Sequence, residues 1–551
     1  MIQIYLKDSA VHSGCRISYT EKQSIMDALI EAGVYVSAIC GGNGTCGKCR
    51  IRLIEGELPV TAADRKAFTQ EELDAGMRLS CVAYPTADVT ISLEQVGEED
   101  FMVLGDAGQK TSGLSGSAET LADGKAQEEA AGPCYFAIDI GTTTLAVSLV
   151  KENGTVVDTY TSVNHQRMYG ADVISRIQAS NDGHGPEMTA SIKKDLQTGM
   201  LSLLKEYPQV SHIIRVVIAG NTTMGHLLMG YDCESLGHVP FTPVNIDWID
   251  TDWEALFGEV PAETEKCQAK TPIIILPGFS AFVGGDITSG LLAMDFDRCE
   301  KPSLFIDLGT NGEMAIGNKD KILVASTAAG PAFEAGNISC GMGSVAGAIC
   351  SVDLSGMSSA GASSVGADGV PEGAVFETLG GKPAKGICGT GVIEVTAELI
   401  KAELLDETGL LDEDYFDDGF PMGVTPEGKE LFFEQSDVRQ LQLAKAAVRG
   451  GVETLMLRYG VTSDDIDKVY LAGGFGVHLN VDKALTIGLL PEEMDGKIEA
   501  VGNTSLLGAI CYGSQENGSE RIDHILECAS EIDLSSDKAF QEFYVDAMFF
   551  E

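Results

Sequence analysis

Four cysteines near the start of the chain have the spacing of a metal-binding set. The first three follow a C-x5-C-x2-C pattern, and 31 residues separate the third from the fourth. Thiolates are soft ligands that suit iron, zinc or copper(I). Zinc ribbons usually carry two C-x2-C pairs, and only one is present here. Three clustered cysteines and a distant fourth match the plant-type [2Fe–2S] pattern, C-x4-C-x2-C…C, with one extra residue in the first gap. The predicted ligands are Cys40, Cys46, Cys49 and Cys81.

The glycines of this loop support a cluster rather than packed thiols. Glycine allows left-handed turns and lets backbone N–H groups approach sulfur closely. The loop glycines are Gly41, Gly42, Gly44 and Gly47. A zinc site and four free thiols are the alternatives. The surrounding strand–helix–loop–strand order is that of a β-grasp ferredoxin domain, and the cysteine spacing is similar to that of vertebrate-type ferredoxins. We therefore expect an α+β ferredoxin domain that relays single electrons.

A second set of residues has the types expected of a nucleotide site. Asp-x-Gly-Thr follows an apolar stretch at Asp139 and again at Asp307. An aspartate at a strand end can hold Mg²⁺ through water, while the glycine, the threonine hydroxyl and the backbone N–H groups accommodate phosphate. A third stretch, "KVYLAGGFGVHL" at 468–479, ends a predicted strand in a glycine pair that could contact a base and ribose. No Walker loop occurs and no G-x-G-x-x-G follows a strand, so NAD or FAD binding lacks support.

Three further acidic residues are candidates for the same site. Asp286 follows a glycine pair, and we expect it either to join the magnesium shell or to cap a helix. Glu313 and Glu334 are candidates for orienting the attacking water, with helix capping or an ordinary polar contact as the alternative.

The three glycine-containing motifs resemble those of the acetate and sugar kinase/Hsp70/actin superfamily. In that superfamily two phosphate loops and an adenosine loop close on Mg-ATP between two lobes, so the resemblance implies Mg-ATP as a cofactor. It implies a first phosphate loop of Asp139, Gly141, Thr142 and Thr143, a second of Asp307, Gly309, Thr310 and Asn311, and an adenosine loop of Gly473, Gly474 and Phe475. The candidate catalytic acids are Asp139, Asp307, Glu313 and Glu334.

Composition along the chain predicts how these sites are organised. Predicted strands and helices alternate from Cys134 onward, which is typical of α/β proteins. The stretch 135–150 is similar to 304–317, which favours two related lobes facing each other. We expect a ferredoxin domain at 1–95, a Gly-, Ser-, Ala- and Glu-rich flexible linker at 96–133, and a two-lobed α/β actin-like ATPase body with lobes at 134–300 and 301–551.

The combination of a [2Fe–2S] domain, a linker and this ATPase body resembles the reductive activators of corrinoid proteins over nearly the whole chain. Further matching segments are "VVIAGNTTMGHLL" (216–228), "PGFSAFVGGDITSGLLA" (277–293) and "AAGPAFEAGNISCGMGS" (328–344). The resemblance implies an ATP-hydrolysing enzyme that delivers one electron to reduce inactive Co(II) to Co(I) for methyl transfer. It also implies a corrinoid protein of a methyltransferase system and an upstream low-potential reductant as partners. Relatives are dimeric, which implies a homodimer.

Two other functions stay open at this point. A redox-coupled ATPase could activate a different metalloenzyme, such as a radical-type dehydratase, but activators of that kind place a [4Fe–4S] cluster at a dimer interface. A kinase or chaperone of the same superfamily could carry an attached ferredoxin without redox coupling. A chaperone would need a separate peptide-binding domain, and only about 75 residues follow the adenosine loop.

The charge of the chain excludes other classes of function. It has 37 Lys and Arg against 82 Asp and Glu, a net charge of −45 that repels nucleic acid. Residues 1–95 hold 9 basic and 12 acidic residues, against 28 and 70 in the remainder. Lys48, Arg50, Arg52 and Arg78 therefore suggest a docking face near the cysteine loop, with solubility alone as the alternative. The absence of a signal peptide or an apolar run of about 18 residues predicts a cytoplasmic protein that does not span a membrane.

Overall fold

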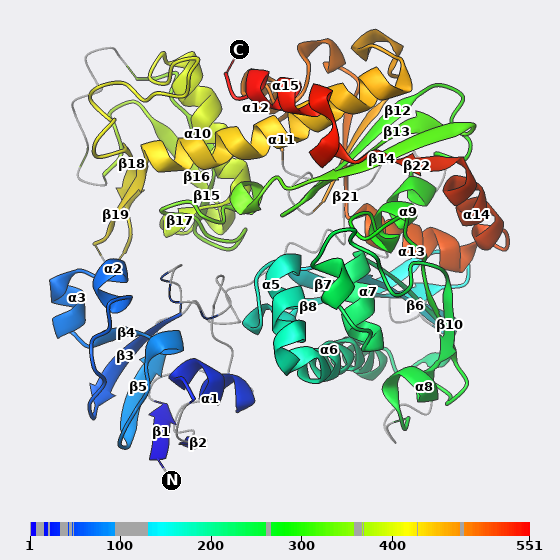
Figure 1. Ribbon diagram of the computed structural model, residues 1–551, viewed down its shortest axis with the longest axis horizontal. Helices are drawn as coiled ribbons and strands as arrows, with labels where there is room; N and C mark the ends of the chain where they lie inside the picture. Colours follow the sequence, from blue (N-terminus) through cyan, green and yellow to red (C-terminus); the bar gives the residue numbers. More distant parts are fainter. Residues whose placement is uncertain are drawn as a thin grey trace.

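The fold consists of a small N-terminal domain and a larger body with two main sheets (Figure 1). The computed structural model describes residues 2–6, 16–19, 23–32, 42, 44, 47, 49–93, 131–260, 266–357, 366, 369–426, 428–473 and 479–550. Most of the predicted linker, 96–133, and two of the predicted cluster ligands, Cys40 and Cys46, lie outside these described residues. No helix among the described residues is long and apolar enough to cross a membrane.

The N-terminal domain is a five-stranded mixed sheet with the order β2-β1-β5-β3-β4. The central strands β1 and β5 run parallel, and the other neighbours are antiparallel. Alternating residues such as Ile4, Ile51 and Ile91 are fully buried, because each strand presents one face to the core. This confirms the expected α+β ferredoxin fold. The elements are β1 (Ile2–Leu6), β2 (Arg16–Tyr19), α1 (Ile25–Glu31), β3 (Arg50–Glu55), α2 (Asp64–Ala67), α3 (Gln70–Asp74), β4 (Met77–Leu79) and β5 (Val89–Leu93).

The first lobe is built on a six-stranded sheet with the order β10-β11-β9-β6-β7-β8. Its central strand β6 is paired in parallel with β9 and antiparallel with β7. Residues 134–138 are all buried, as expected for a strand covered on both faces. The strands are β6 (Gly132–Ile140), β7 (Thr144–Lys151), β8 (Val156–Val163), β9 (Val210–Gly220), β10 (Ile249–Asp252) and β11 (Pro272–Ile275), and the helices are α5 (Val173–Ala179), α6 (Gly185–Glu206), α7 (Thr222–Met229) and α8 (Trp253–Phe257).

The second lobe repeats this arrangement with the order β21-β20-β12-β13-β14-β22. Here β12 is paired in parallel with β20 and antiparallel with β13, as β6 is with β9 and β7. The expected pair of related α/β lobes is therefore present. The elements are β12 (Ser303–Leu308), β13 (Gly312–Asn318), β14 (Lys321–Thr327), β20 (Val469–Ala472), β21 (Ile498–Gly502), β22 (Ala529–Glu531), α11 (Gln435–Tyr459) and α15 (Lys538–Asp546).

A smaller part of the second lobe extends beyond its main sheet and packs on the same hydrophobic core. It contains the sheet β16-β15-β17 and the hairpin β18-β19. Its elements are β15 (Ala348–Asp353), β16 (Val375–Thr378), β17 (Gly386–Ile387), α10 (Gly389–Lys401), β18 (Phe420–Val424), β19 (Glu430–Phe433) and α12 (Val481–Thr486).

Three helices lie between the two main sheets: α9 (Gly285–Ala293), α13 (Thr504–Ser514) and α14 (Gly518–Cys528). Helix α9 follows the first sheet, yet a Cβ at its Gly290 would lie 2.6 Å from Phe305 in β12 of the second. Helix α13 follows strand β21 of the second sheet, yet Tyr135 of β6 donates a hydrogen bond to the Ile510 carbonyl at 2.7 Å. The two helices contact each other at Gly508, where a Cβ would be 1.9 Å from the Ser289 carbonyl oxygen. The lobes thus share one continuous buried layer.

Candidate functional site

The two predicted phosphate loops follow equivalent strands. Asp139 lies near the end of β6, level with Ala146 of β7 and Ala219 of β9. Asp307 lies near the end of β12, level with Glu313 of β13 and Ala472 of β20. Each aspartate is therefore held between two paired strands, and the short turn after it leads into the next strand.

The predicted acidic residues from both lobes lie close enough to raise one another's pKa values. Burial, together with the charges of Asp286, Asp139 and Glu334, raises the pKa of Asp307 to about 8. Burial raises the pKa of Asp286 to about 7, and the Asp139 charge adds to this. Burial also raises the pKa of Glu313 well above its usual value, with further contributions from Asp286 and Asp307. Five carboxyl groups predicted from separate motifs therefore lie within electrostatic range of one another. This carboxylate cluster consists of Asp139, Asp286, Asp307, Glu313 and Glu334.

Asp139 is held by the start of helix α13. Asn503 Nδ2 donates to its Oδ2 at 2.8 Å, and Ser505 Oγ donates to its Oδ1 at 2.6 Å. Burial raises the pKa of Asp139, and these two hydrogen bonds oppose the rise. Asn503 also caps α13 by accepting from the Leu506 N–H at 2.8 Å. A catalytic candidate of the first sheet is thus oriented by a helix that arrives from the second.

Glu334 connects the two predicted phosphate loops. Its Oε2 accepts from the Thr143 hydroxyl at 3.2 Å, and its Oε1 accepts from the Thr310 hydroxyl at 3.0 Å. It lies in the short 3-10 turn Pro331–Glu334, and the next residue, Ala335, is left-handed with a φ of 57°. Asn311 of the second loop donates to Glu313 Oε1 at 3.3 Å. Both candidate water-orienting residues therefore contact phosphate-loop side chains.

The predicted adenosine loop begins next to Asp307. Gly473 has a φ of 97°, and a Cβ there would lie 2.7 Å from the Leu308 carbonyl oxygen and 2.8 Å from Asp307 Oδ1. Only glycine suits both the backbone conformation and the space. Gly474 and Phe475 lie outside the described residues.

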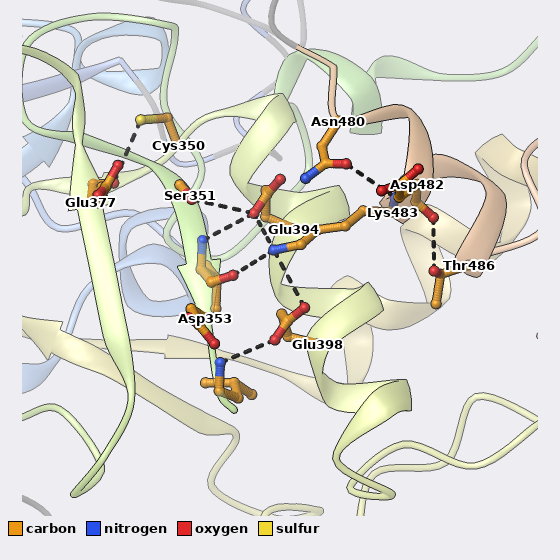
Figure 2. A network of polar contacts seen from close by, with 12 residues as sticks. Cys350, Ser351, Asp353, Glu377, Glu394, Glu398, Asn480, Asp482, Lys483 and Thr486 are labelled. Carbon is orange, nitrogen blue, oxygen red and sulfur yellow. Dashed lines mark hydrogen bonds and ion pairs between the residues drawn. The ribbon is translucent and has the colours of Figure 1, made fainter. Parts of the chain in front are cut away.

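Helix α12, which follows the adenosine loop, is anchored by a buried ion pair (Figure 2). Lys483 Nζ contacts Glu394 Oε2 and lies 3.4 Å from Glu398 Oε1, both on α10. It also donates to the Val352 carbonyl of β15 at 2.5 Å. Glu394 accepts from the Val352 N–H at 3.1 Å, so α10, α12 and β15 are joined by one network.

The carboxylate cluster suits a cation that is held through water. No three Cys, His, Asp or Glu side chains in the described ranges converge into a complete metal-binding set. Mg²⁺ typically keeps several waters and uses one or two carboxylates together with substrate phosphates. Buried carboxyl groups with raised pKa values would be stabilised as anions by such an ion. Asp139, Asp286 and Asp307 supply oxygen atoms of the kind that a magnesium ion bound through water and phosphate would use.

The two described cysteines of the predicted cluster lie together in the core of the N-terminal domain. Cys49 Sγ and Cys81 Sγ are 3.2 Å apart, and their residues are 1% and 5% exposed. This separation is too long for a disulfide bond, which is about 2.05 Å. Hydrogen bonding to the Cys81 thiol lowers the pKa of Cys49 to about 6. Close, buried sulfurs with thiolate character are the donor set that a cluster requires.

The loop backbone next to these cysteines has the left-handed conformation expected of a loop that turns tightly around a cluster. Gly42, Gly44 and Gly47 all have positive φ angles, of 88°, 69° and 66°. A Cβ at Gly42 would lie 2.7 Å from Met26 Cε and 3.9 Å from Cys81 Cβ, so the backbone passes very close to the core.

Of the four residues of the predicted docking face, Lys48 lies outside the described residues and Arg78 is buried. Arg78 is 8% exposed and donates to the carbonyls of Leu58 and Leu73 at 3.1 and 3.0 Å. It therefore stabilises the fold and is not available for docking. Arg50 is half-buried and donates to the Gly47 carbonyl at 2.9 Å, which ties it to the cysteine loop.

Several residues of the site were not identified from the sequence. Asn503 and Ser505 belong to "VGNTSLLGA", a strand followed by a helix cap, which is an ordinary N-terminal helix signal. Lys483 is an isolated lysine on a short helix. Arg176 and Asn164 contact the first phosphate loop and lie in 164–178, a segment that carries no recognisable nucleotide motif.

Three family models match successive parts of the chain. Residues 11–86 match the 2Fe-2S iron-sulfur cluster binding domain, residues 134–299 match the RACo middle region, and residues 301–551 match the C-terminal domain of RACo, the ASKHA domain. These matches support a [2Fe–2S] cluster and nucleotide binding. The [2Fe–2S] match includes all four predicted ligand positions.

The chain is also similar to curated and solved proteins. It is 28% identical to the corrinoid activation enzyme RamQ of Eubacterium limosum, over 96% of each chain. It is 31% identical to the [Co(II) methylated amine-specific corrinoid protein] reductase of Methanosarcina barkeri, over 51% of this chain and 52% of that one. A solved reductive activator for corrinoid, iron-sulfur protein is 27% identical, with a TM-score of 0.65 over 100% of this chain and 98% of that chain.

Proposed function

Because this chain belongs to the RACo family, we propose that it uses ATP to reduce the inactive Co(II) state of a corrinoid protein to Co(I). The relatives that it matches are named for corrinoid activation or for reduction of a Co(II) corrinoid protein. The [2Fe–2S] cluster supplies the single electron for this step, and hydrolysis of ATP to ADP and phosphate supplies free energy.

On the electron side, we assign Cys40, Cys46, Cys49 and Cys81 as the cluster ligands. The short separation of Cys49 and Cys81 and their burial support this assignment for the two described members. Burial would keep water away from the cluster, while the neighbouring Arg50 offers a cationic surface to an acidic partner.

On the nucleotide side, we assign 139–143 and 307–311 as phosphate loops and Asp139, Asp286 and Asp307 as the magnesium shell. Thr143 and Thr310 would donate to phosphate oxygens, and Gly473 would leave room for the adenosine moiety. Glu313 and Glu334 are the candidates for orienting the attacking water, because each already contacts a phosphate-loop side chain.

The observation that carries this proposal is the contact of one carboxylate, Glu334, with threonines of both phosphate loops. A nucleotide that engages both loops must change this contact, so its binding can favour one arrangement of the lobes over another. ATP can shift a redox equilibrium only if it binds two such states with different affinity. The corrinoid protein would then be bound in the conformational state in which its cobalt is easier to reduce.

The direct test mixes the purified holoprotein, a reductant, Mg-ATP and a Co(II) corrinoid protein, and follows formation of Co(I) by absorbance. We expect reduction that requires ATP and ATP hydrolysis that is stimulated by the Co(II) partner. A reduced cluster with ATP turnover but no Co(I) would overturn the corrinoid assignment and leave a redox ATPase for another metalloenzyme. Phosphate transfer to a small acceptor would instead indicate a kinase.

The remaining expectations are also part of this proposal. We place the protein in the cytoplasm, with a low-potential reductant upstream and a homodimer as its assembly. Sedimentation analysis of the holoprotein would test the homodimer.

A further inference from the structure

Two fully buried polar side chains hold the backbone of the first phosphate loop. Asn164 and Arg176 are both 0% exposed. Asn164 follows β8 and caps the turn His165–Met168, and its Nδ2 donates to the Gly141 carbonyl at 2.9 Å. Arg176 lies in α5 and its Nη2 donates to the Thr142 carbonyl. Two successive peptide groups of the loop are therefore fixed by side chains that come 23 and 34 residues later in the chain, outside its motif.

Both side chains are themselves held in place. Arg176 Nε donates to the Gly170 carbonyl at 2.9 Å, and its Nη1 lies 3.1 Å from Met224 Sδ. The Asn164 oxygen accepts from the Gln166 N–H at 3.0 Å, and the Asn164 N–H donates to the Thr143 carbonyl at 3.0 Å. Neither donor can turn away without breaking a second hydrogen bond.

The planarity of the peptide bond gives these contacts a consequence on the other side of the loop. In a trans peptide the C=O and the following N–H point in opposite directions. Holding the Gly141 carbonyl toward Asn164 aims the Thr142 N–H away from it, and holding the Thr142 carbonyl toward Arg176 aims the Thr143 N–H away from that side chain. Two neighbouring N–H groups that face outward together form a site for an anion.

The loop allows no simple alternative conformation. A Cβ at Gly141 would lie 2.6 Å from the Thr144 carbonyl oxygen, so the turn is closed tightly on itself. Arg176 also places a buried positive charge behind the loop, in a chain of net charge −45. A charge screened from water acts more strongly at short range than one on the surface.

We propose that Asn164 and Arg176 are positioning residues for the polyphosphate of the nucleotide. They do not touch it themselves; they hold the Gly141 and Thr142 peptides so that the next two N–H groups face the phosphates. This inference rests on the proposed function, because it takes 139–143 as the first phosphate loop.

The test compares nucleotide binding in three variants of the full-length holoprotein. Arg176→Met removes the charge and all hydrogen bonds of the guanidinium, Arg176→Lys keeps the charge on one nitrogen in place of three, and Asn164→Asp keeps the shape but replaces the donor with an acceptor oxygen that adds a negative charge when ionised. The affinities for Mg-ATP and for inorganic tripolyphosphate are measured by displacement of a fluorescent ATP analogue. Arg298→Met is the matched control, because it removes one positive charge from an arginine whose side chain is 53% exposed.

We expect Arg176→Met to weaken ATP and tripolyphosphate binding by about 10- to 100-fold and Arg176→Lys to recover part of this loss, since each lost charge-assisted hydrogen bond costs about a factor of ten or more. Asn164→Asp should weaken both ligands by a similar factor, and the control should change neither. Iron content and the unfolding midpoint establish that each variant is folded.

The inference is overturned if the folded Arg176→Lys and Asn164→Asp proteins bind both ligands within twofold of the wild type, even if Arg176→Met does not fold. A wild-type protein that binds no ATP overturns the phosphate-loop assignment and the proposed function together. A wild type that binds ATP normally but leaves Co(II) unreduced overturns only the corrinoid assignment, and the positioning role stands.

Discussion

The Thr143 hydroxyl donates a hydrogen bond of 3.2 Å to Glu334, which joins the proposed first phosphate loop to the second lobe. The other oxygen of the same carboxylate accepts from Thr310 at 3.0 Å. Glu334 thus lies where the phosphate of a nucleotide held by both loops is expected. The contact is made by a flexible charged side chain and two hydroxyls, so nucleotide binding can replace it without disturbing the buried layer between the lobes.

Replacing Glu334 by glutamine should separate binding from hydrolysis. The amide keeps the size of the side chain but cannot act as a base toward water, so we expect kcat for ATP hydrolysis to fall by about 10²- to 10⁴-fold while KM changes much less. Steady-state phosphate release measures both constants. Thr143→Ser is the control, because it retains the hydroxyl and should keep near wild-type rates. An unchanged kcat in Glu334→Gln would assign the carboxylate a purely structural role.

The carboxylate cluster should make stability depend on pH when magnesium and nucleotide are absent. Asp286 and Asp307 have folded-state pKa values of about 7 and about 8, against an ordinary value of 3.8. Between pH 3.8 and about pH 8 the folded protein keeps protons that the unfolded chain has released. The free energy of unfolding therefore falls as pH rises across this range. Thermal unfolding in chelator at a series of pH values would measure this loss.

The Asp286→Asn variant provides the comparison for the pH effect. It removes one of the repelling carboxyl groups, so without magnesium its unfolding midpoint should exceed that of the wild type by an amount that grows as pH rises from 3.8 and levels off above about pH 8. Saturating Mg-ATP should reverse the order, because the wild type gains more from the bound ion. Parallel pH profiles for the two proteins in chelator would contradict the proposed cluster.

Loss of either described cluster cysteine should uncouple electron transfer from ATP turnover. We expect Cys49→Ser and Cys81→Ser to lose most iron and the visible absorbance of the cluster, and to leave Co(II) unreduced. Basal ATP hydrolysis should persist, because the phosphate loops belong to separate hydrophobic cores from those cysteines. Cys528→Ser, at a cysteine of the ATPase body, should retain full iron content. A Cys81→Ser protein with normal iron would exclude Cys81 as a ligand.

The buried lysine that anchors α12 should support both stability and nucleotide affinity. Lys483→Met leaves Glu394 without its cation and Glu398 with Lys401 alone, and breaking a buried pair typically costs about 3–5 kcal/mol. We expect a lower unfolding midpoint and a raised KM for ATP, since α12 follows the strand end at Gly473. Adding Glu394→Gln should restore part of the stability, as a double-mutant cycle would show. Strictly additive losses would indicate that the pair is not coupled.

Much of the protein could be predicted from short stretches of sequence. The spacing of four cysteines indicated the iron–sulfur domain, because cluster ligands must come from one tight loop and a nearby strand. The repeated Asp-x-Gly-Thr indicated two related lobes, because each phosphate loop is a local turn between adjacent strands. The strand–helix–loop–strand order expected around the cysteine loop is likewise present, as β2, α1 and β3.

Only the tertiary structure decided how these local pieces are joined. Asn503 and Ser505 reach Asp139 because α13 crosses between the sheets, and Arg176 reaches Thr142 because α5 packs behind the loop. Arg78, which is close to the cysteines in sequence, points into the core instead of toward a partner. A local motif is set by the conformations of a few consecutive residues, whereas these contacts depend on how distant elements pack, and no spacing in the chain records that packing.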